Sequence, residues 1–217
     1  MSQESGRGSD LFDIQAGLYV PDLGREKGTI VVQRWDDDQS SWVSRKLGGE
    51  GVGRRGFIQG NWPDFHRHGV RPYSVTEDTG NLITTGGWDR ILTRATGGSS
   101  TAYASATTRI GVATGTAAAA SGDVNFSATT TGTANRWMQR VTGDGVVGTG
   151  TGVRRVSFVS TVGTGDGNIA WQEWGIDQGA TNDAGAITAP LLNHAISAQG
   201  TKASGQTWTA TALLDFT

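Results

Sequence analysis

The pentapeptide Trp171-Gln-Glu-Trp-Gly175 has the residue types most suited to chemistry in this chain. In an extended strand Trp171 and Glu173 share one face, and Trp174 lies on the other. Aromatic rings beside a carboxylate suit sugar binding, so Trp171 and Trp174 are candidate ligand-stacking residues. Glycoside hydrolysis needs a second carboxylate close by, but the remaining acids of this region are scattered and fall mostly in expected turns. The favoured interpretation is therefore a core tryptophan and a Glu173 satisfied by backbone donors.

A second candidate is the segment Asp64-Phe-His66-Arg-His68, whose three potential ligands share one face if it is extended. Two imidazoles and a carboxylate suit a transition metal. Only one further histidine, His194, exists to complete a site within one chain. We favour surface or interface histidines and expect no metal. The alternative is a site shared by symmetry, in which three His66–His68 pairs surround the axis of a trimer.

The run Gly143-Asp-Gly-Val-Val-Gly148 formally matches the dinucleotide-binding pattern GxGxxG. That pattern binds pyrophosphate only where a helix follows it, and here more glycine and an expected strand follow. We interpret the run as a turn. No GxSxG, HExxH or Walker A sequence is present. The sequence predicts a protein that is not an enzyme and uses no cofactor.

Composition narrows the classes of partner. The 18 basic and 20 acidic residues give a net charge of −2, which offers no electrostatic reason to expect nucleic acid or an anionic membrane surface as a partner. The chain lacks cysteine, which removes disulfides and thiol catalysis. No apolar run resembles a signal peptide or a membrane span, so neither is expected.

The chain divides into two regions of different composition. Residues 1–90 carry 24 of the 38 charged side chains, and the later residues are rich in Gly, Thr and Ala. We expect residues 1–80 to form an extended attachment arm with a β-hairpin over about 28–47, because two strand-like runs flank the polar turn 36–40. This region has too little apolar patterning for a core of its own. Its tryptophans are therefore the expected interface anchors: Trp35, Trp42 and Trp62.

Residues 81–217 are predicted to form an all-β domain, either a β-sandwich or a jelly roll, with one short helix. Trp88, Ile91, Leu92 and Ala95 are spaced for one helical face, between a Thr84 or Thr85 cap and Gly97-Gly98. The clearest strand is 206–216, where apolar and threonine side chains alternate. Further strands are expected over 108–113, 123–128, 136–142, 153–162 and 169–177. Turn-forming sequences separate them, as in sandwiches.

Four segments of this second region occur in the same order in a family of tailed-bacteriophage virion structural proteins, which the chain resembles over about residues 81–217. They are the helix entry 81–92, the strand and loop 109–120 (Arg-Ile-Gly-Val-Ala-Thr-Gly-Thr-Ala-Ala-Ala-Ala), the segment 169–176 (Ile-Ala-Trp-Gln-Glu-Trp-Gly-Ile) and the closing strands 192–208. The resemblance implies a particle component located in the virion. It transfers no binding residue.

We therefore expect a virion structural protein, and specifically a capsid-decorating (cement) protein, because a compact head and a gripping arm suit that role and no fibre shaft is visible. The alternatives are a tail-tip or tail-fibre (receptor-binding) component and a carbohydrate-binding module. The expected partners are copies of the chain itself, with a trimer favoured by the resemblance, and the major capsid protein or tail proteins of the same virion.

Overall fold

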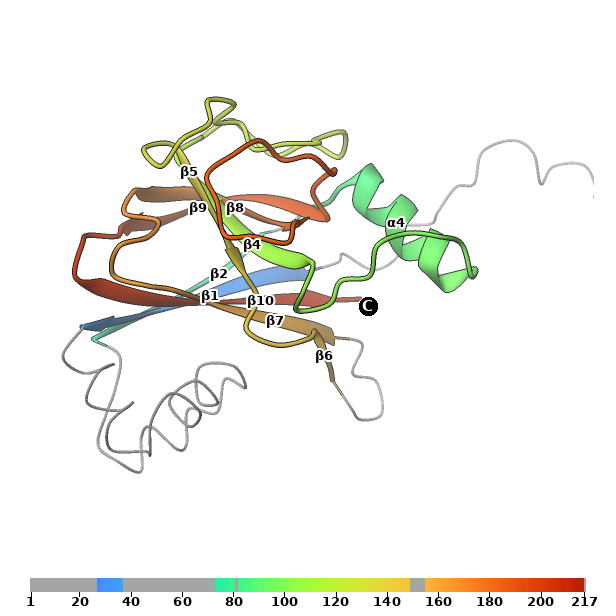
Figure 1. The fold of residues 1–217 in the computed structure, drawn as a ribbon, viewed down its shortest axis with the longest axis horizontal. Coiled ribbons are helices and arrows are strands. Elements are labelled where there is room, and N and C mark those ends of the chain that lie inside the picture. The colour runs from blue at the N-terminus through green and yellow to red at the C-terminus, as the bar shows by residue number, and fades with distance from the viewer. Residues whose placement is uncertain (1–26, 37–72, 81, 149–154, 217) are drawn as a thin grey trace, which may run out of the picture.

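The computed structural model describes residues 27–36, 73–80, 82–148 and 155–216 (Figure 1). They form two five-stranded antiparallel sheets and a short helix. The first sheet has the order β2-β1-β10-β7-β6, and the second has the order β3-β9-β8-β4-β5. The strands of the first sheet are β1 (Lys27–Asp36), β2 (Ser74–Thr79), β6 (Val146–Val147), β7 (Arg155–Val162) and β10 (Gln206–Asp215). Those of the second are β3 (Leu82–Ile83), β4 (Thr108–Ala113), β5 (Arg136–Arg140), β8 (Ala170–Gln178) and β9 (Asn193–Thr201). The all-β, sandwich-like prediction is confirmed.

Alternation along β10 builds the core between the sheets. Ala210 and Ala212 lie opposite Val32 and Ile30 of β1, so small side chains face branched ones across the pair. All four are buried in one apolar cluster with side chains of the second sheet. At its centre the rings of Trp171 and Trp208, one from each sheet, meet edge to face with centroids 4.9 Å apart. Each large apolar side chain buried here stabilises the fold by about 1.5–3 kcal/mol.

The N-terminal boundary expected at residue 80 needs correction. β1 lies between β10 and β2 and pairs with both over residues 29–34. The predicted strand at residue 28 is therefore part of the sandwich, not of an arm, because its Ile30 and Val32 complete the core. Both hydrogen-bonding edges of β1 are occupied by β10 and β2 along that stretch, so β1 is not one half of a simple hairpin. The expected second hairpin strand, like residues 1–26 and 37–72 of the predicted arm, lies outside the described residues, whereas residues 74–79 form β2 and also belong to the sandwich.

Most predicted strands of the second region are confirmed: β4, β5, β7, β8 and β10 lie within a few residues of the expected ranges. The strand expected over 123–128 is wrong, because this segment is a loop. The short edge strands β2, β3 and β6 were not predicted from the residues. The closing strands that the resemblance implies correspond to β9 and the start of β10.

Helix α4 (Thr85–Ala95) is confirmed with its cap. Thr84 Oγ1 accepts a hydrogen bond from the Gly87 amide at 3.0 Å, and Gly97 follows the helix with φ of +80°. The expected apolar face is only partly right. Trp88 and Ile91 are half-buried, but Leu92 is exposed, as is Ala95. The helix instead lies close to the sandwich at its first turn, where Gly87 is buried.

Gly87 gives the first testable prediction. A Cβ placed on Gly87 would lie 2.1 Å from the carbonyl oxygen of Leu192, whereas one on Gly122 would meet nothing within 4 Å. Alanine is favoured over glycine in helices by about 1 kcal/mol. At Gly87, however, the clash with a fixed backbone makes the change to alanine destabilising. We expect Gly87→Ala to lower the free energy of unfolding by about 1–3 kcal/mol and Gly122→Ala to change it by less than about 0.5 kcal/mol. Urea denaturation measures both, and an unchanged or stabilised Gly87→Ala would contradict the close approach.

Candidate functional site

The two tryptophans of the unusual pentapeptide are core residues. β8 shifts register against β9 between Trp171 and Glu173. As a result Trp171 and Trp174 both belong to the cluster between the sheets and are almost fully buried. The candidate stacking role of Trp171 and Trp174 is therefore corrected, because neither ring is available to a ligand. The favoured interpretation, a core tryptophan and a Glu173 satisfied by backbone donors, is confirmed, and the second tryptophan, which was expected on the opposite face, is also a core residue.

Glu173 lies on the outer face of the second sheet and is fully buried beneath a loop. Its carboxylate accepts hydrogen bonds from the amides of Gly115, Ser127 and Ala128 at 3.0, 2.8 and 2.9 Å, and from the Ser127 hydroxyl at 2.8 Å. The amides of Ser127 and Ala128 are donors that a strand over 123–128 would have used in a ladder. One buried carboxylate thus holds both ends of the loop 114–128 against the sheet.

His194 extends this network from β9. Its Nε2 lies 2.9 Å from Glu173 Oε2, and its Nδ1 lies 2.6 Å from Asp123 Oδ2. Burial alone would lower the pKa of His194, but the hydrogen bonds to Glu173 and Asp123 outweigh it and raise the pKa above the usual 6.5. Burial would likewise raise the pKa of Glu173, but hydrogen bonds from His194, Ala128 and Ser127 lower it to about 2. Both ring nitrogens are occupied by carboxylates, so His194 has no free nitrogen with which to act as a general base.

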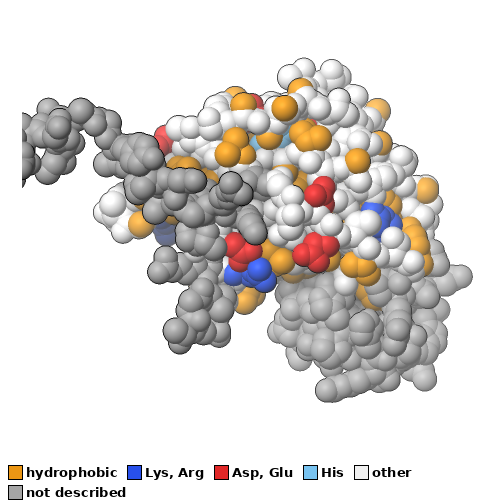
Figure 2. Space-filling view, turned by 180° about the vertical axis from the view of Figure 1, so that it is seen from behind, with side chains coloured by type: hydrophobic (Ala, Val, Ile, Leu, Met, Phe, Trp, Pro, Cys, Tyr) orange, Lys and Arg blue, Asp and Glu red, His pale blue; other side chains and the backbone are white. Residues whose placement is uncertain are grey.

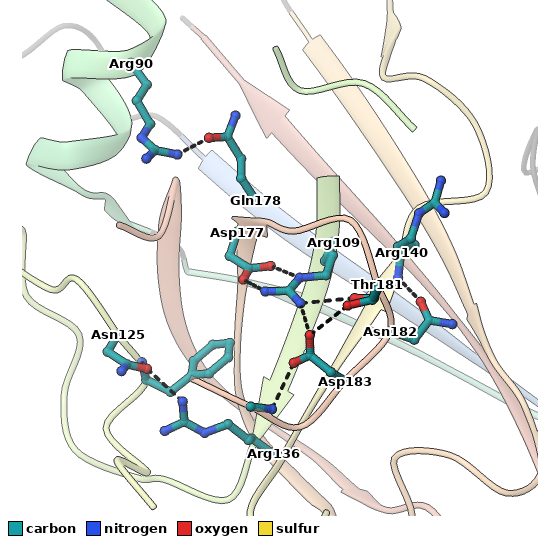
Figure 3. A network of polar contacts seen from close by, with 12 residues as sticks. Arg90, Arg109, Asn125, Arg136, Arg140, Asp177, Gln178, Thr181, Asn182 and Asp183 are labelled. Atoms are coloured by element: carbon teal, nitrogen blue, oxygen red, sulfur yellow. Dashed lines mark hydrogen bonds and ion pairs between the residues drawn. The ribbon is translucent and has the colours of Figure 1, made fainter. Parts of the chain in front are cut away.

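Arg136 of β5 supports the same loop. Its guanidinium donates to Asn125 Oδ1 at 3.1 Å (Figure 3), and it also donates to the carbonyl oxygen of Ala128. The side chain is fully buried, and burial lowers the pKa of Arg136. Together, the three residues Glu173, His194 and Arg136 form what we call the loop clamp.

A second buried network fastens the next loop of the same face. The Arg109 guanidinium binds both carboxylate oxygens of Asp177, with one nitrogen–oxygen distance of 3.0 Å, and also reaches Asp183 at 2.6 Å and the carbonyl oxygen of Thr181 at 3.1 Å (Figure 3). Gly179 lies directly against this guanidinium, where a Cβ would come within 2.2 Å of Arg109 Cζ. The loop that follows β8 is thus held to β4 by charge-assisted hydrogen bonds.

Lys202 closes a third loop. Its buried ammonium donates to the carbonyl oxygens of Gly163 and Asp166 at 2.7 and 2.8 Å and to Asn168 Oδ1 at 2.8 Å. Burial lowers the pKa of Lys202 to about 8. All three ammonium protons have acceptors, so the lysine ties the turn between β7 and β8 to the end of β9.

An apolar pocket of about 420 Å³ lies at one end of the sandwich. It lies between α4 and the ends of β7 and β10, and nearly all of its lining is apolar: Ile91, Tyr103, Gly145, Val147, Val156, Phe158, Leu192, Leu214 and Phe216. Its volume is within the usual range of binding pockets, about 300–1,000 Å³. At its margin Val147 is 63% exposed. This pocket is the candidate binding site of the fold, and the sequence pattern gave no sign of it.

The loop clamp predicts a pH dependence. The contribution of Glu173 is complete above its unfolded pKa near 4.5 and is lost as the pH falls toward about 2. The contribution of His194 is complete below 6.5 and is lost as the pH rises through its raised folded pKa. We therefore expect the difference in unfolding free energy between the wild type and His194→Gln to be largest between pH 4.5 and 6.5. Urea denaturation from pH 2 to 9 measures it, and a difference that grows above pH 7 would contradict the charged imidazolium.

Of the other candidate site residues singled out from the sequence, only Trp35 lies within the described residues. Trp42, Trp62, His66 and His68 lie outside the described residues, so their roles stay predictions. Trp35 is fully buried within the chain itself, on the face of β1 opposite Ile30 and Val32. Its expected role as an anchor on a neighbouring subunit is corrected, because no part of the ring is left to contact one.

Reasoning from the sequence missed the partners of Glu173, and no local signal could have identified them. Asp123, Glu173 and His194 are separated by 50 and 21 positions and meet only through the sheet. Within the described ranges, no group of three or more His or acidic residues is arranged to hold a metal ion, and no helix has the length and apolarity to cross a membrane. No protein-family model, curated protein or solved structure matches this chain.

Proposed function

We propose that this chain is a structural component of a tailed-bacteriophage virion, and specifically a capsid-decorating protein that binds the outer surface of the particle. The resemblance over residues 81–217 motivates the class of protein. The observation that carries the proposal is the use of the buried charges: Glu173, His194, Arg109 and Lys202 all hold loops in place. Charged groups that an enzyme would direct at a substrate serve here to stiffen a scaffold.

Rigid loops suit a protein that must present a fixed surface for assembly. The loops over the second sheet are held by buried ionic contacts, so each keeps one conformation. Such loops lose little conformational entropy when the protein binds a partner. Figure 2 shows one face of the molecule, where the few charged side chains of both signs are dispersed and the apolar ones form small separate groups. Among the described residues of this face, no patch of a single charge sign is present to bind nucleic acid.

Exposed sheet edges favour assembly over a solitary role. The first sheet ends in β2, where side chains are alternately exposed, and in the two-residue β6, whose valines are both exposed. Edge strands offer unpaired backbone groups to another chain. We propose that the chain forms a homo-oligomer, with a trimer favoured, and that it contacts the major capsid protein.

The structure weakens one of the two alternative functions. The carbohydrate-binding hypothesis loses its support, because the stacking candidates Trp171 and Trp174 are buried in the core. A tail-tip or tail-fibre role would use the same rigid sandwich at a different place on the particle.

Immunogold labelling separates these positions. An antibody raised against residues 82–217 should label the heads of intact particles that are produced from the genome encoding this chain. Labelling of tails alone would overturn the decoration proposal and favour the tail component. An absence of label on particles, with the antigen remaining in the cell lysate, would overturn the virion proposal itself.

A further inference from the structure

The apolar pocket is placed where the N-terminal segment joins the sandwich. Leu214 and Phe216, at the end of β10, line the pocket. Gly28, at the start of β1, lies directly opposite Leu214 in the pair, and Lys27 lies opposite Asp215. Directly paired residues of antiparallel strands are about 5 Å apart. β1 therefore begins beside the pocket, near the C-terminal end in Figure 1.

The preceding segment has the composition needed to fill such a pocket. Leu18-Tyr19-Val20 is an apolar run, and only residues 21–26 separate it from β1. At about 3.3–3.6 Å per residue, that tether spans roughly 20 Å when extended. Pro21, Asp22 and Gly24 are turn-forming residues that allow the chain to reverse, and the position before Pro21 favours an extended Val20.

We propose that the pocket between α4, β7 and β10 is the docking site for the chain's own segment Leu18–Val20. A short tether holds the segment near the pocket at an effective concentration on the order of millimolar, which favours the chain's own segment over that of a second copy in dilute solution. Docking covers apolar side chains that otherwise face water. This inference does not depend on the location of the protein in a particle.

Disulfide trapping in the full chain tests the proposal, because the natural sequence has no cysteine. The test variant combines Tyr19→Cys with Val147→Cys at the margin of the pocket. The control combines Tyr19→Cys with Val124→Cys, on a loop over the second sheet. Val147 and Val124 are 63% and 62% exposed, so the two positions are matched in residue type and accessibility. Neither substitution removes a core side chain.

Under mild oxidation of dilute protein, we expect an intramolecular disulfide to form at least about ten-fold faster in the Val147→Cys pair than in the Val124→Cys pair, as local concentration dictates. Mass spectrometry of the non-reduced protein measures both rates. Adding Leu18→Asp and Val20→Asp should reduce the faster rate to that of the control. Equal rates would overturn the proposal. A predominantly intermolecular disulfide at position 147 would also overturn it, and would show that the pocket receives a segment from a second copy.

Discussion

Replacing Glu173 with glutamine should lower the free energy of unfolding by about 3–5 kcal/mol, the cost of removing one partner from a buried charge pair. The change keeps the shape of the side chain, so the loss is electrostatic. One carboxylate oxygen accepts from Gly115 and Ala128, and the other accepts from Ser127 and His194. In either orientation, the amide nitrogen of glutamine would face at least two hydrogen-bond donors. Such a loss is a large share of the 5–15 kcal/mol that stabilises an ordinary domain.

The matched control for this substitution is Glu77→Gln on β2. Glu77 is exposed and lies on an edge strand, so its loss of charge should change stability by less than about 0.5 kcal/mol. Limited proteolysis gives a second measurement, since loosening of the clamp should expose the loop 114–128 to cleavage before the rest of the chain. A Glu173→Gln variant as stable as Glu77→Gln would show that the loop is held by other contacts.

The second large effect is expected at Arg109. In Arg109→Leu the fully buried Asp177 loses its cationic partner, and we expect a loss of about 3–5 kcal/mol. Removing both charges should be less costly, because a buried ion pair can often be replaced by apolar side chains. The double variant Arg109→Leu/Asp177→Leu should therefore be more stable than the single variant. Asp183 does not prevent this recovery, because it is 37% exposed and can be solvated.

A surface pair provides the control for this double-mutant cycle. Arg155 and Asp215 form an ion pair in which Arg155 is 47% exposed, and exposed pairs contribute about 0–1 kcal/mol. Arg155→Leu should therefore have a small effect on the urea midpoint. The single variant Asp177→Leu completes the cycle. If the losses of stability in Arg109→Leu and Asp177→Leu simply add in the double variant, the two side chains do not stabilise each other and the proposed fastening of the loop is wrong.

Local sequence patterns predicted the elements in which apolar side chains recur on one buried face or in which capping residues mark both ends. β10 and β7 were identifiable because apolar residues alternate along them, and α4 because a threonine cap and a glycine end enclose it. The segment 123–128 has a similar composition but is a loop, because two of its amides bind a carboxylate 45 or more positions away. No pattern within the segment reveals such a partner.

Pairing between distant strands accounts for the other differences. The strand at β1 was predicted, but its partner β10 lies about 180 positions later, so its place in the sandwich was not visible locally. A register shift in β8 turned Trp171 and Trp174 toward the same core, which regular alternation would have separated. The apolar pocket combines side chains from α4, from the first sheet and from loops, including Leu192 just before β9, and it appears only once these elements are assembled.

The number of copies per particle tests the proposed function most directly. Quantitative mass spectrometry of purified particles, calibrated against the major capsid protein, should find on the order of hundreds of copies of this chain, because capsid symmetry repeats each surface site many times. On the order of ten copies would place the protein in the tail and contradict the decoration proposal. Its absence from purified particles would contradict a structural role in the virion.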